Sequence, residues 1–246
     1  TNNPKFIDQT LINGNQAGTV VTFNSGENAN AKLQGFTITN GDSENGGGIL
    51  CLRSNPTIEH CLIIGNSAAG VGGAIFCQGA TSLIANCTIS DNTANESGGA
   101  IFGWDETVLN INNCILWNNS PQEISFLRFG NPNLLNISYT NLDGGIEAII
   151  LRDNAEISEG DGVIVSDPLF ANPQGYDFFL EEDSPCIDAG NPELPLDADS
   201  SFSDIGALPV RSQEIELSNE LMEFGDIHLG RIDSIGLTIS NVGQSP

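Results

Sequence analysis

The sequence predicts an all-β protein whose main part is a right-handed parallel β-solenoid with about 26 residues per coil. Glycine-rich segments that lead into an Ile-containing strand recur at this constant spacing, over residues 46–51, 72–77 and 98–103. Short apolar stretches with period-two alternation follow each of them and are separated by Gly and Asn turns. One such repeat cannot bury its apolar face alone, whereas stacked repeats can.

Two columns of aliphatic residues are expected to form the core of this solenoid. Strands of adjacent coils lie about 4.8 Å apart, so equivalent residues stack like on like. The chirality of connections between parallel strands predicts a right-handed winding. The same alternation places Thr88 on the outer face. The inward columns are Ile49, Ile75 and Ile101, and Ile38, Ile63, Ile89 and Leu116. A third column, Ile58, Ile84 and Ile111, precedes each cysteine by three residues and indicates a third strand in each repeat.

Asparagines and cysteines also recur at fixed points of the repeat. Asn66, Asn92 and Asn119 each follow a cysteine by five residues, which predicts a structural amide ladder at a left-handed bend. The parallel side-chain directions of stacked cysteines make a disulfide dihedral awkward, so we expect buried free thiols. No two cysteines are separated by two residues, which gives a paired zinc site no support. The six cysteines are Cys51, Cys61, Cys77, Cys87, Cys114 and Cys186.

The repeat segments resemble a known group of proteins. Gly-Gly-Ala-Ile-Phe at 72–76 and Ile-Ala-Asn-Cys-Thr-Ile-Ser-Asp-Asn at 84–92 resemble coils of secreted bacterial right-handed β-helix proteins of the pectate-lyase-like superfamily. They are also similar to the Gly-Gly-Ala-Ile repeats of chlamydial polymorphic outer-membrane proteins. Segments 166–173, 184–192 and 204–207 look like the closing region of the same secreted group. The resemblance implies an extracellular β-helix but no particular reaction, because the superfamily includes lyases, hydrolases, adhesins and binding modules.

Four segments are therefore expected along the chain. Residues 1–30 form an N-terminal cap or first strands, 31–145 form four or five coils, and 146–210 form an acidic closing region. The segments 215–217, 221–226 and 236–243 resemble the opening strands of an immunoglobulin-like β-sandwich. Such a domain needs about 100 residues, so 211–246 is expected to be an incomplete sandwich segment.

Charge and hydropathy limit the possible partners. The chain has 7 Lys and Arg against 32 Asp and Glu, a formal charge of 7 − 32 = −25. This balance disfavours nucleic acid, whose phosphates are bound by basic surfaces. No apolar run reaches the roughly 18–20 residues that span a bilayer, so no transmembrane segment is expected. A secreted or cell-surface location fits best, because cations outside the cell screen or bridge carboxylates.

The closing region holds the best candidate for a metal site. Acidic residues far outnumber its single arginine, Arg152. Asp197 and Asp199, with Asp204 further on, resemble the alternating oxygen ligands of calcium loops. The sequence thus suggests calcium at these three residues, with a solvated acidic turn as the alternative.

An apolar stripe is the best candidate for a ligand or partner surface. If the Ile columns point inward, alternation sends a second column outward from the same strands. Exposed aromatic and apolar stripes contact sugar faces or other proteins, so a polysaccharide or another surface protein is the expected partner. The alternative is that a loop of this chain, for instance residues 146–185, covers the stripe. The outward residues are Leu50, Phe76, Phe102, Leu52, Gln78 and Trp104.

Catalytic chemistry has weaker support. A β-eliminating lyase needs a basic residue beside a cation at the substrate carboxylate, and Arg53 is the best-placed base in the coils. His60 alternates to the outside, where a solvated role is the simpler interpretation. An inverting hydrolase needs two carboxylates on one face, and no acidic pair recurs with that spacing. We therefore assign no catalytic residue and keep Arg53 as the alternative.

Two functional hypotheses follow. The first is a non-catalytic extracellular or cell-surface β-helix module for adhesion, assembly or glycan contact within a larger secreted protein. The second is a calcium-dependent polysaccharide lyase or a related carbohydrate-active enzyme. Unfinished strands over 213–243 also leave backbone edges open, so self-association by strand addition, up to a filament, is a further possibility.

Overall fold

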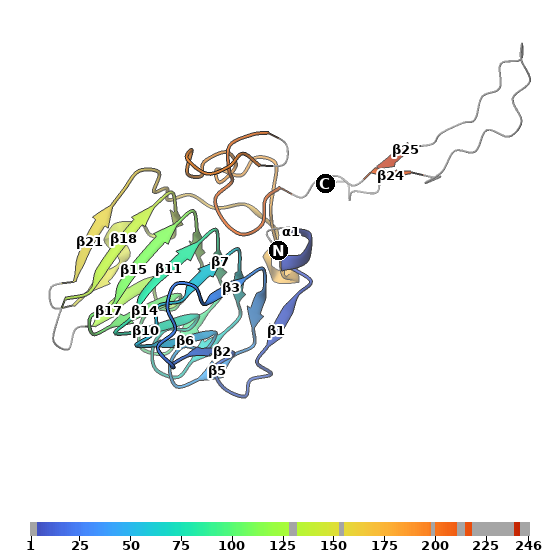
Figure 1. Cartoon of the computed structure of the whole chain (residues 1–246). Coiled ribbons are helices and arrows are strands. Elements are labelled where there is room, and N and C mark those ends of the chain that lie inside the picture. The colour runs from blue at the N-terminus through green and yellow to red at the C-terminus, as the bar shows by residue number, and fades with distance from the viewer. Residues whose placement is uncertain are drawn as a thin grey trace, which may run out of the picture. The chain divides into compact units, whose positions relative to one another are not determined.

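The computed structural model describes residues 4–127, 132–152, 155–197, 200–210, 215–217 and 239–241. The chain divides into two compact units, Thr1–Val210 and Arg211–Pro246. The first unit is a parallel β-solenoid of about six coils with about 26 residues each, which confirms the predicted fold class. Figure 1 shows its strands side by side, from blue in the first coil to yellow in the last. The right-handed winding stays a prediction.

Sheet 1 is the first wall of the solenoid. It has six parallel strands in the order β1-β4-β8-β12-β16-β19. Every neighbouring pair is in a register that places equivalent repeat positions opposite each other, as in Ile38↔Ile63. The strands are β1 (Leu11–Asn13), β4 (Thr37–Thr39), β8 (Leu62–Ile64), β12 (Thr88–Ser90), β16 (Ile115–Trp117) and β19 (Asn141–Leu142).

Sheet 2 is the second wall, and three of its strands follow the glycine-rich segments. Its order is β2-β6-β10-β14-β17-β20, again all parallel, with Ile75 paired to both Ile49 and Ile101. The strands are β2 (Val21–Phe23), β6 (Ile49–Leu52), β10 (Ile75–Gln78), β14 (Ile101–Trp104), β17 (Ile124–Leu127) and β20 (Ile150–Leu151).

Sheet 3 completes the three walls, and a small fourth sheet lines the corner between sheets 1 and 2. Sheet 3 has the order β21-β18-β15-β11-β7-β3, and the small sheet has the order β13-β9-β5. The strands of sheet 3 are β3 (Lys32–Gln34), β7 (Thr57–Glu59), β11 (Thr81–Ala85), β15 (Val108–Asn112), β18 (Leu134–Ser138) and β21 (Glu156–Glu159). Those of the small sheet are β5 (Asp42–Ser43), β9 (Ser67–Ala68) and β13 (Thr93–Ala94).

The expectation of four or five coils was too low. Strands β1 and β2 pair with β4 and β6, so a first coil already starts at Leu11. At the other end, β20 and β21 pair with β17 and β18 and form a last coil. Neither end carries the glycine-rich motif, and for this reason the repeat spacing does not reveal them.

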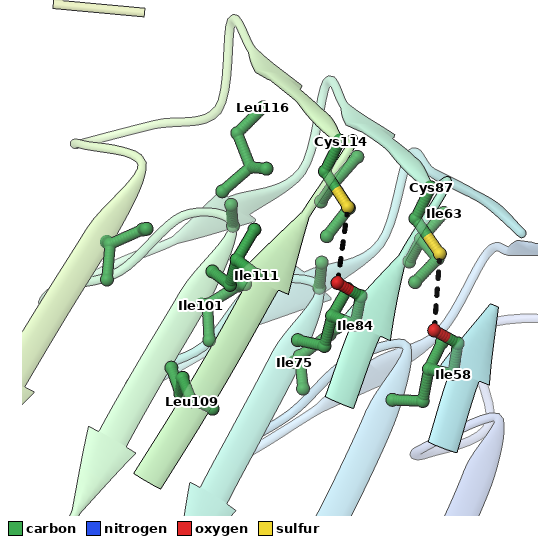
Figure 2. Packing of buried hydrophobic residues seen from close by; sticks show 14 of the residues in the cluster. Ile58, Ile63, Ile75, Ile84, Cys87, Ile101, Leu109, Ile111, Cys114 and Leu116 are labelled. Carbon is green, nitrogen blue, oxygen red and sulfur yellow. Dashed lines mark hydrogen bonds between the residues drawn. The ribbon is translucent and has the colours of Figure 1, made fainter. Parts of the chain in front are cut away.

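The predicted inward columns form the core. Ile49, Ile75 and Ile101 are fully buried, as are the Ile columns of sheets 1 and 3 apart from traces of exposure. Figure 2 shows these side chains from adjacent strands packed against one another inside the coils. Gly103 occupies the place of Cys77 in its column because a Cβ there would lie 2.4 Å from the Phe126 ring. The large ring of the next coil thus requires the small residue.

All six cysteines are buried and free, as predicted. The Cys87 thiol donates to the Ile58 carbonyl at 3.6 Å and the Cys114 thiol to the Ile84 carbonyl at 3.5 Å, as Figure 2 shows. Burial raises the pKa of Cys87 well above its usual value. A protonated thiol is a poor nucleophile, so this column is structural.

The predicted asparagine ladder is present and bonds as expected. Asn66 Nδ2 donates to Asn92 Oδ1 at 2.9 Å, and Asn92 Nδ2 donates to Asn119 Oδ1 at 2.8 Å. The left-handed bend lies one residue earlier than predicted, at Gly65, Asp91 and Asn118. The bend turns the backbone, and the side-chain amide of the asparagine that follows it donates to a carbonyl of the preceding coil.

The closing region covers the outer face of sheet 1. From the last coil the chain returns through β22 (Phe170–Asn172), η2 (Pro173–Gly175) and β23 (Asp177–Leu180). Phe178, Phe179 and Leu208 pack on Leu62 and Ile64, together with Ile7 at the end of the short helix α1 (Pro4–Ile7). Further along, Leu180, Cys186 and Ile205 pack on Ile115. The last coil also contains the short η1 (Ile146–Ala148).

This cover corrects the expectation for Thr88. The residue does point outward, but it is fully buried because the closing region lies on it. Its hydroxyl accepts a hydrogen bond of 3.0 Å from the Ala207 N–H. A residue that faces outward from sheet 1 beneath the closing region is therefore part of the protein interior.

The second unit contains one described strand pair. β24 (Ile215–Leu217) and β25 (Ile239–Asn241) are antiparallel, with Glu216 opposite Ser240. The remaining residues of the immunoglobulin-like segment, including Leu221, Phe224 and Leu237, lie outside the described residues. The sandwich therefore stays a prediction.

Candidate contact surface

The predicted apolar stripe lies on the outer face of sheet 2, but its centre is closed to solvent. Phe76 and Phe102 are only 3% and 4% exposed. Their rings stack with centroids 5.9 Å apart and planes 4° apart, and Trp104 meets Phe76 edge-on at 6.2 Å. The expectation of an exposed aromatic column was therefore wrong for these two rings. Leu50, Leu52, Gln78 and Trp104 are half-buried and form the accessible part of the stripe.

The alternative that residues 146–185 cover the stripe is also not what the structure shows. That part of the chain first contributes β20 and β21 to the last coil. It then packs on sheet 1, through contacts of Phe170, Phe178 and Leu180. The rings of Phe76 and Phe102 instead stack on each other across adjacent coils and lie against the corner residues Gly46 and Gly98.

A cavity of about 490 Å³ joins three of the predicted site residues at the edge of this face. It is lined by Leu52, Arg53 and Gln78, with Asn24 and Gly26 from the first coil. We call it the Arg53 cavity. Leu52 and Gln78 are paired in register in β6 and β10, so the cavity spans adjacent coils.

A backbone bend explains why Arg53 reaches this cavity. Arg53, Gly79 and Asp105 follow their strands at equivalent positions, and all three have left-handed φ values near +50°. The Arg53 N–H donates to the Gln78 carbonyl at 2.8 Å, which holds the bend against the next coil. The Arg53 side chain is thereby directed out from the corner and is exposed.

The electrostatics of the Arg53 cavity are mixed. Among the described residues, Lys32 forms an ion pair with Glu59 at 2.9 Å, whereas no ion pair joins Arg53. Glu27 lies beside the cavity, where hydrogen bonding by Ser54 lowers the pKa of its carboxyl. The guanidinium can therefore bind one carboxylate in a bidentate way, while Leu52 and Gln78 supply apolar and amide contacts.

The structure brings two of the three predicted calcium ligands, Asp197 and Asp204, close together. Asp204 N–H donates to Asp197 Oδ2 at 3.0 Å, and Asp188 N–H donates to Asp204 Oδ1 at 2.9 Å. Asp199 lies outside the described residues. Within the described ranges, no set of three or more His, Cys, Asp or Glu side chains is arranged to hold a metal ion. Calcium at this turn stays a prediction.

A buried carboxyl that sequence reasoning missed ends the asparagine ladder. Glu123 is 5% exposed, and its two oxygens accept hydrogen bonds from the Asn119 N–H at 2.9 Å and from Asn119 Nδ2 at 2.6 Å. Burial raises the pKa of Glu123 to about 8, against the opposing effect of these bonds. The only signal in the sequence is an acidic residue four positions after the last ladder asparagine.

A second cavity, of about 400 Å³, was also missed. It lies between the end of sheet 1 and the closing region, with Trp117 in its lining. Trp117 follows the Cys114 column at an outward position, but its opposite wall comes from a segment about 50 residues later. No periodicity links the two segments.

His60, which was expected to be solvated, is half-buried at a left-handed bend. Burial lowers the pKa of its imidazole.

Comparisons with known proteins support the repeat type. Residues 60–78 and 86–103 match the model of the Chlamydia polymorphic membrane protein repeat. The first stretch contains β8, β9 and β10. The second contains β12, β13 and most of β14, up to Gly103. Searches of curated proteins and of solved structures gave no match. No helix among the described residues is long and apolar enough to cross a membrane. Two coils of this parallel β-solenoid thus contain segments similar to the polymorphic membrane protein repeat.

Proposed function

We propose that this chain is a non-catalytic β-helix module of a surface or secreted protein that contacts a polysaccharide or another surface protein through the open face of sheet 2. The observation that carries the proposal is the Arg53 cavity, which joins Leu52, Arg53 and Gln78 on that face. The repeat match supports a surface location, because its family is one of membrane proteins.

The shape of the face favours contact over enclosure. Stacked rings of Phe76 and Phe102 make it flat and rigid, and the Arg53 cavity lies at its edge. A partner that places one carboxylate on Arg53 could lay an apolar surface across Leu50 and Trp104. The remaining surface of the chain is strongly acidic, so Arg53 also sets the orientation of such a partner.

Binding of hexagalacturonate to immobilised protein tests this proposal at physiological ionic strength. We expect measurable binding that Arg53→Ala weakens by about tenfold, because a charge-assisted contact is lost. Lys32→Ala is the matched control, since Lys32 is also an exposed basic residue but lies in β3 on sheet 3. Absence of binding, or equal binding by the Arg53→Ala protein, would contradict a role for this cavity in carboxylate contact.

The same reagents separate the lyase alternative from contact alone. A lyase would release unsaturated products, detectable by ultraviolet absorbance, when calcium is added to polygalacturonate. We expect no product from the wild-type protein. Product formation that Arg53→Ala abolishes would overturn the non-catalytic proposal and assign the base.

A further inference from the structure

The second cavity combines an aromatic wall with a ring of uncharged and acidic polar groups. We call it the Trp117 cavity. Its volume of about 400 Å³ lies near the lower end of the range for small-molecule sites, about 300–1,000 Å³. It is lined by Ser90, Asp91, Trp117, Asn118, Asp167, Leu169, Phe170, Pro173, Gln174 and Glu181.

The wall on the solenoid side is held rigidly. Trp117 occupies an outward position at the end of β16, next to Ser90 in register. Its carbonyl accepts hydrogen bonds from Ser90 Oγ at 2.8 Å and from Asn119 Nδ2 at 3.2 Å. The backbone that carries the indole is therefore tied to the asparagine ladder, and the half-buried Trp117 side chain lines the cavity.

The opposite wall comes from the closing region and is also held in place. Leu169 has a left-handed φ of 52°, and its N–H donates to Asp167 Oδ1 at 3.0 Å. The Glu181 N–H donates to the Leu169 carbonyl at 2.9 Å. Phe170 packs edge-on against the buried Phe178 at 5.1 Å. Two fixed walls of different origin thus face each other across the cavity.

The polar lining is suited to hydroxyl groups. Asn118 Nδ2 is hydrogen-bonded to Asp91 Oδ1, which orients both side chains. Asp167, Gln174 and Glu181 are exposed at the rim. Carboxylates accept hydrogen bonds from hydroxyls, and side-chain amides both donate and accept them. Among the residues that the structure describes, no Lys, Arg or His lines the cavity, so the described lining offers no positive charge to an acidic ligand.

We propose that the Trp117 cavity binds one uncharged sugar ring, stacked on the Trp117 indole and hydrogen-bonded through its hydroxyls by the carboxylates and amides of the lining. An aromatic face offers an apolar platform to the C–H face of a sugar. The lining carboxylates repel uronic acids, so this site and the Arg53 cavity differ in the charge of the sugar that they accept. The inference does not rest on the function proposed for the Arg53 cavity.

Tryptophan fluorescence gives a direct readout because the chain has only two tryptophans. Trp104→Phe leaves Trp117 as the sole indole. We expect cellohexaose, laminarihexaose or mannohexaose to change its emission saturably, and hexagalacturonate to leave it unchanged. If none of the three neutral oligosaccharides changes the emission, the proposal is overturned.

Variants locate the binding. Trp117→Ala should weaken binding of the responding oligosaccharide at least about tenfold, measured by calorimetry, whereas Trp104→Ala on sheet 2 should leave it unchanged. Because Trp117 also packs on neighbours of Ile115, its loss could loosen the closing region. Gln174→Ala is therefore the second variant, since its side chain is exposed and a weaker affinity there cannot come from core disruption. Unchanged affinity in both Trp117→Ala and Gln174→Ala would place the sugar elsewhere.

Discussion

Sheets 1 and 2 have similar strands and register but reach burial of their outer faces in different ways. On sheet 1, Leu62, Ile64 and Ile115 are covered by the returning chain. On sheet 2, Phe76 and Phe102 stack on each other across adjacent coils and lie against the corner residues Gly46 and Gly98. An apolar residue at an outward position of a solenoid therefore does not by itself indicate a binding face. The accessible part of sheet 2, at Leu50, Leu52, Gln78 and Trp104, is the part left for a partner.

Glu123, at the corner between the two sheets, is expected to give the largest effect: a loss of folding stability as pH rises. The folded protein holds the proton of Glu123 up to a pH of about 8, while the unfolded chain releases it near 4.5. Its contribution to stability is thus fully favourable below about pH 4.5 and is lost as pH rises through about 8. At about 1.4 kcal/mol per pKa unit, the loss has an upper bound of about 5 kcal/mol.

Urea unfolding between pH 4 and 9 measures this loss, with Glu123→Gln as the control. The general repulsion of a chain with a charge of −25 also lowers stability as pH rises, and it acts equally in the variant. We expect the difference between the two proteins to grow with pH in favour of Glu123→Gln. A difference that is independent of pH would contradict the buried, proton-retaining carboxyl.

Removing the cover should destabilise sheet 1 selectively. Phe178 is almost fully buried against Leu62 and Ile64, so Phe178→Ala should cost about 3–5 kcal/mol. It should also speed proteolysis within residues 164–210. The matched variant Phe76→Ala on sheet 2 should lower stability without increasing cleavage there. Equal cleavage in both variants would show that the closing region does not depend on this contact.

Replacing one outward-facing threonine on each sheet compares the covered and accessible faces through smaller changes in stability. Thr88→Ala leaves the buried Ala207 N–H without its acceptor and should cost about 1–3 kcal/mol. Thr22, at an outward position of β2 on sheet 2, is exposed, and Thr22→Ala should change stability by less than about 0.5 kcal/mol. Chemical denaturation measures both. Similar values for the two variants would mean that sheet 1 is not covered.

Calcium is expected to have the smallest effect. If the turn with Asp197, Asp199 and Asp204 binds calcium, free ion at about five times Kd adds only about 1 kcal/mol of stability. A chelator at low ionic strength should then lower the melting temperature slightly, and Asp197→Asn should remove that response. A melting curve that a chelator leaves unchanged would argue against this prediction.

The sequence predicts what repeats locally and misses what depends on distant contacts. Ile75 and Asn92 recur at fixed spacing, so their inward positions follow from the period alone. Thr88 and Phe76 were both placed outward correctly, but their burial depends on the closing region and on ring stacking. The return of the closing region onto Thr88 has no periodic signal, whereas the stacking of Phe76 on Phe102 follows the 26-residue spacing.

Among the candidate sites, one could also be placed from the repeat and the others depend on contacts that the repeat does not specify. Arg53 and Gln78 could be placed near each other from register, because both follow from the 26-residue repeat. The Trp117 cavity needs residues 167–181 to return along sheet 1, and no pattern in the sequence specifies that path. Glu123 was missed because the equivalent positions in the preceding coils hold Ala100, Ala74 and Gly48, so no repeated acidic residue marks the site.

Hydroxyl-radical footprinting of the free protein and of the protein with hexagalacturonate tests most directly whether sheet 2 is the contact face. The structure predicts that Leu52 and Leu50 react in the free protein and are protected by the ligand. Leu62 and Ile115 should be unreactive in both states, because the closing region covers them. Reactive Leu62 in the free protein, or unchanged reactivity of Leu52 with ligand bound, would contradict the assignment of the covered and open faces.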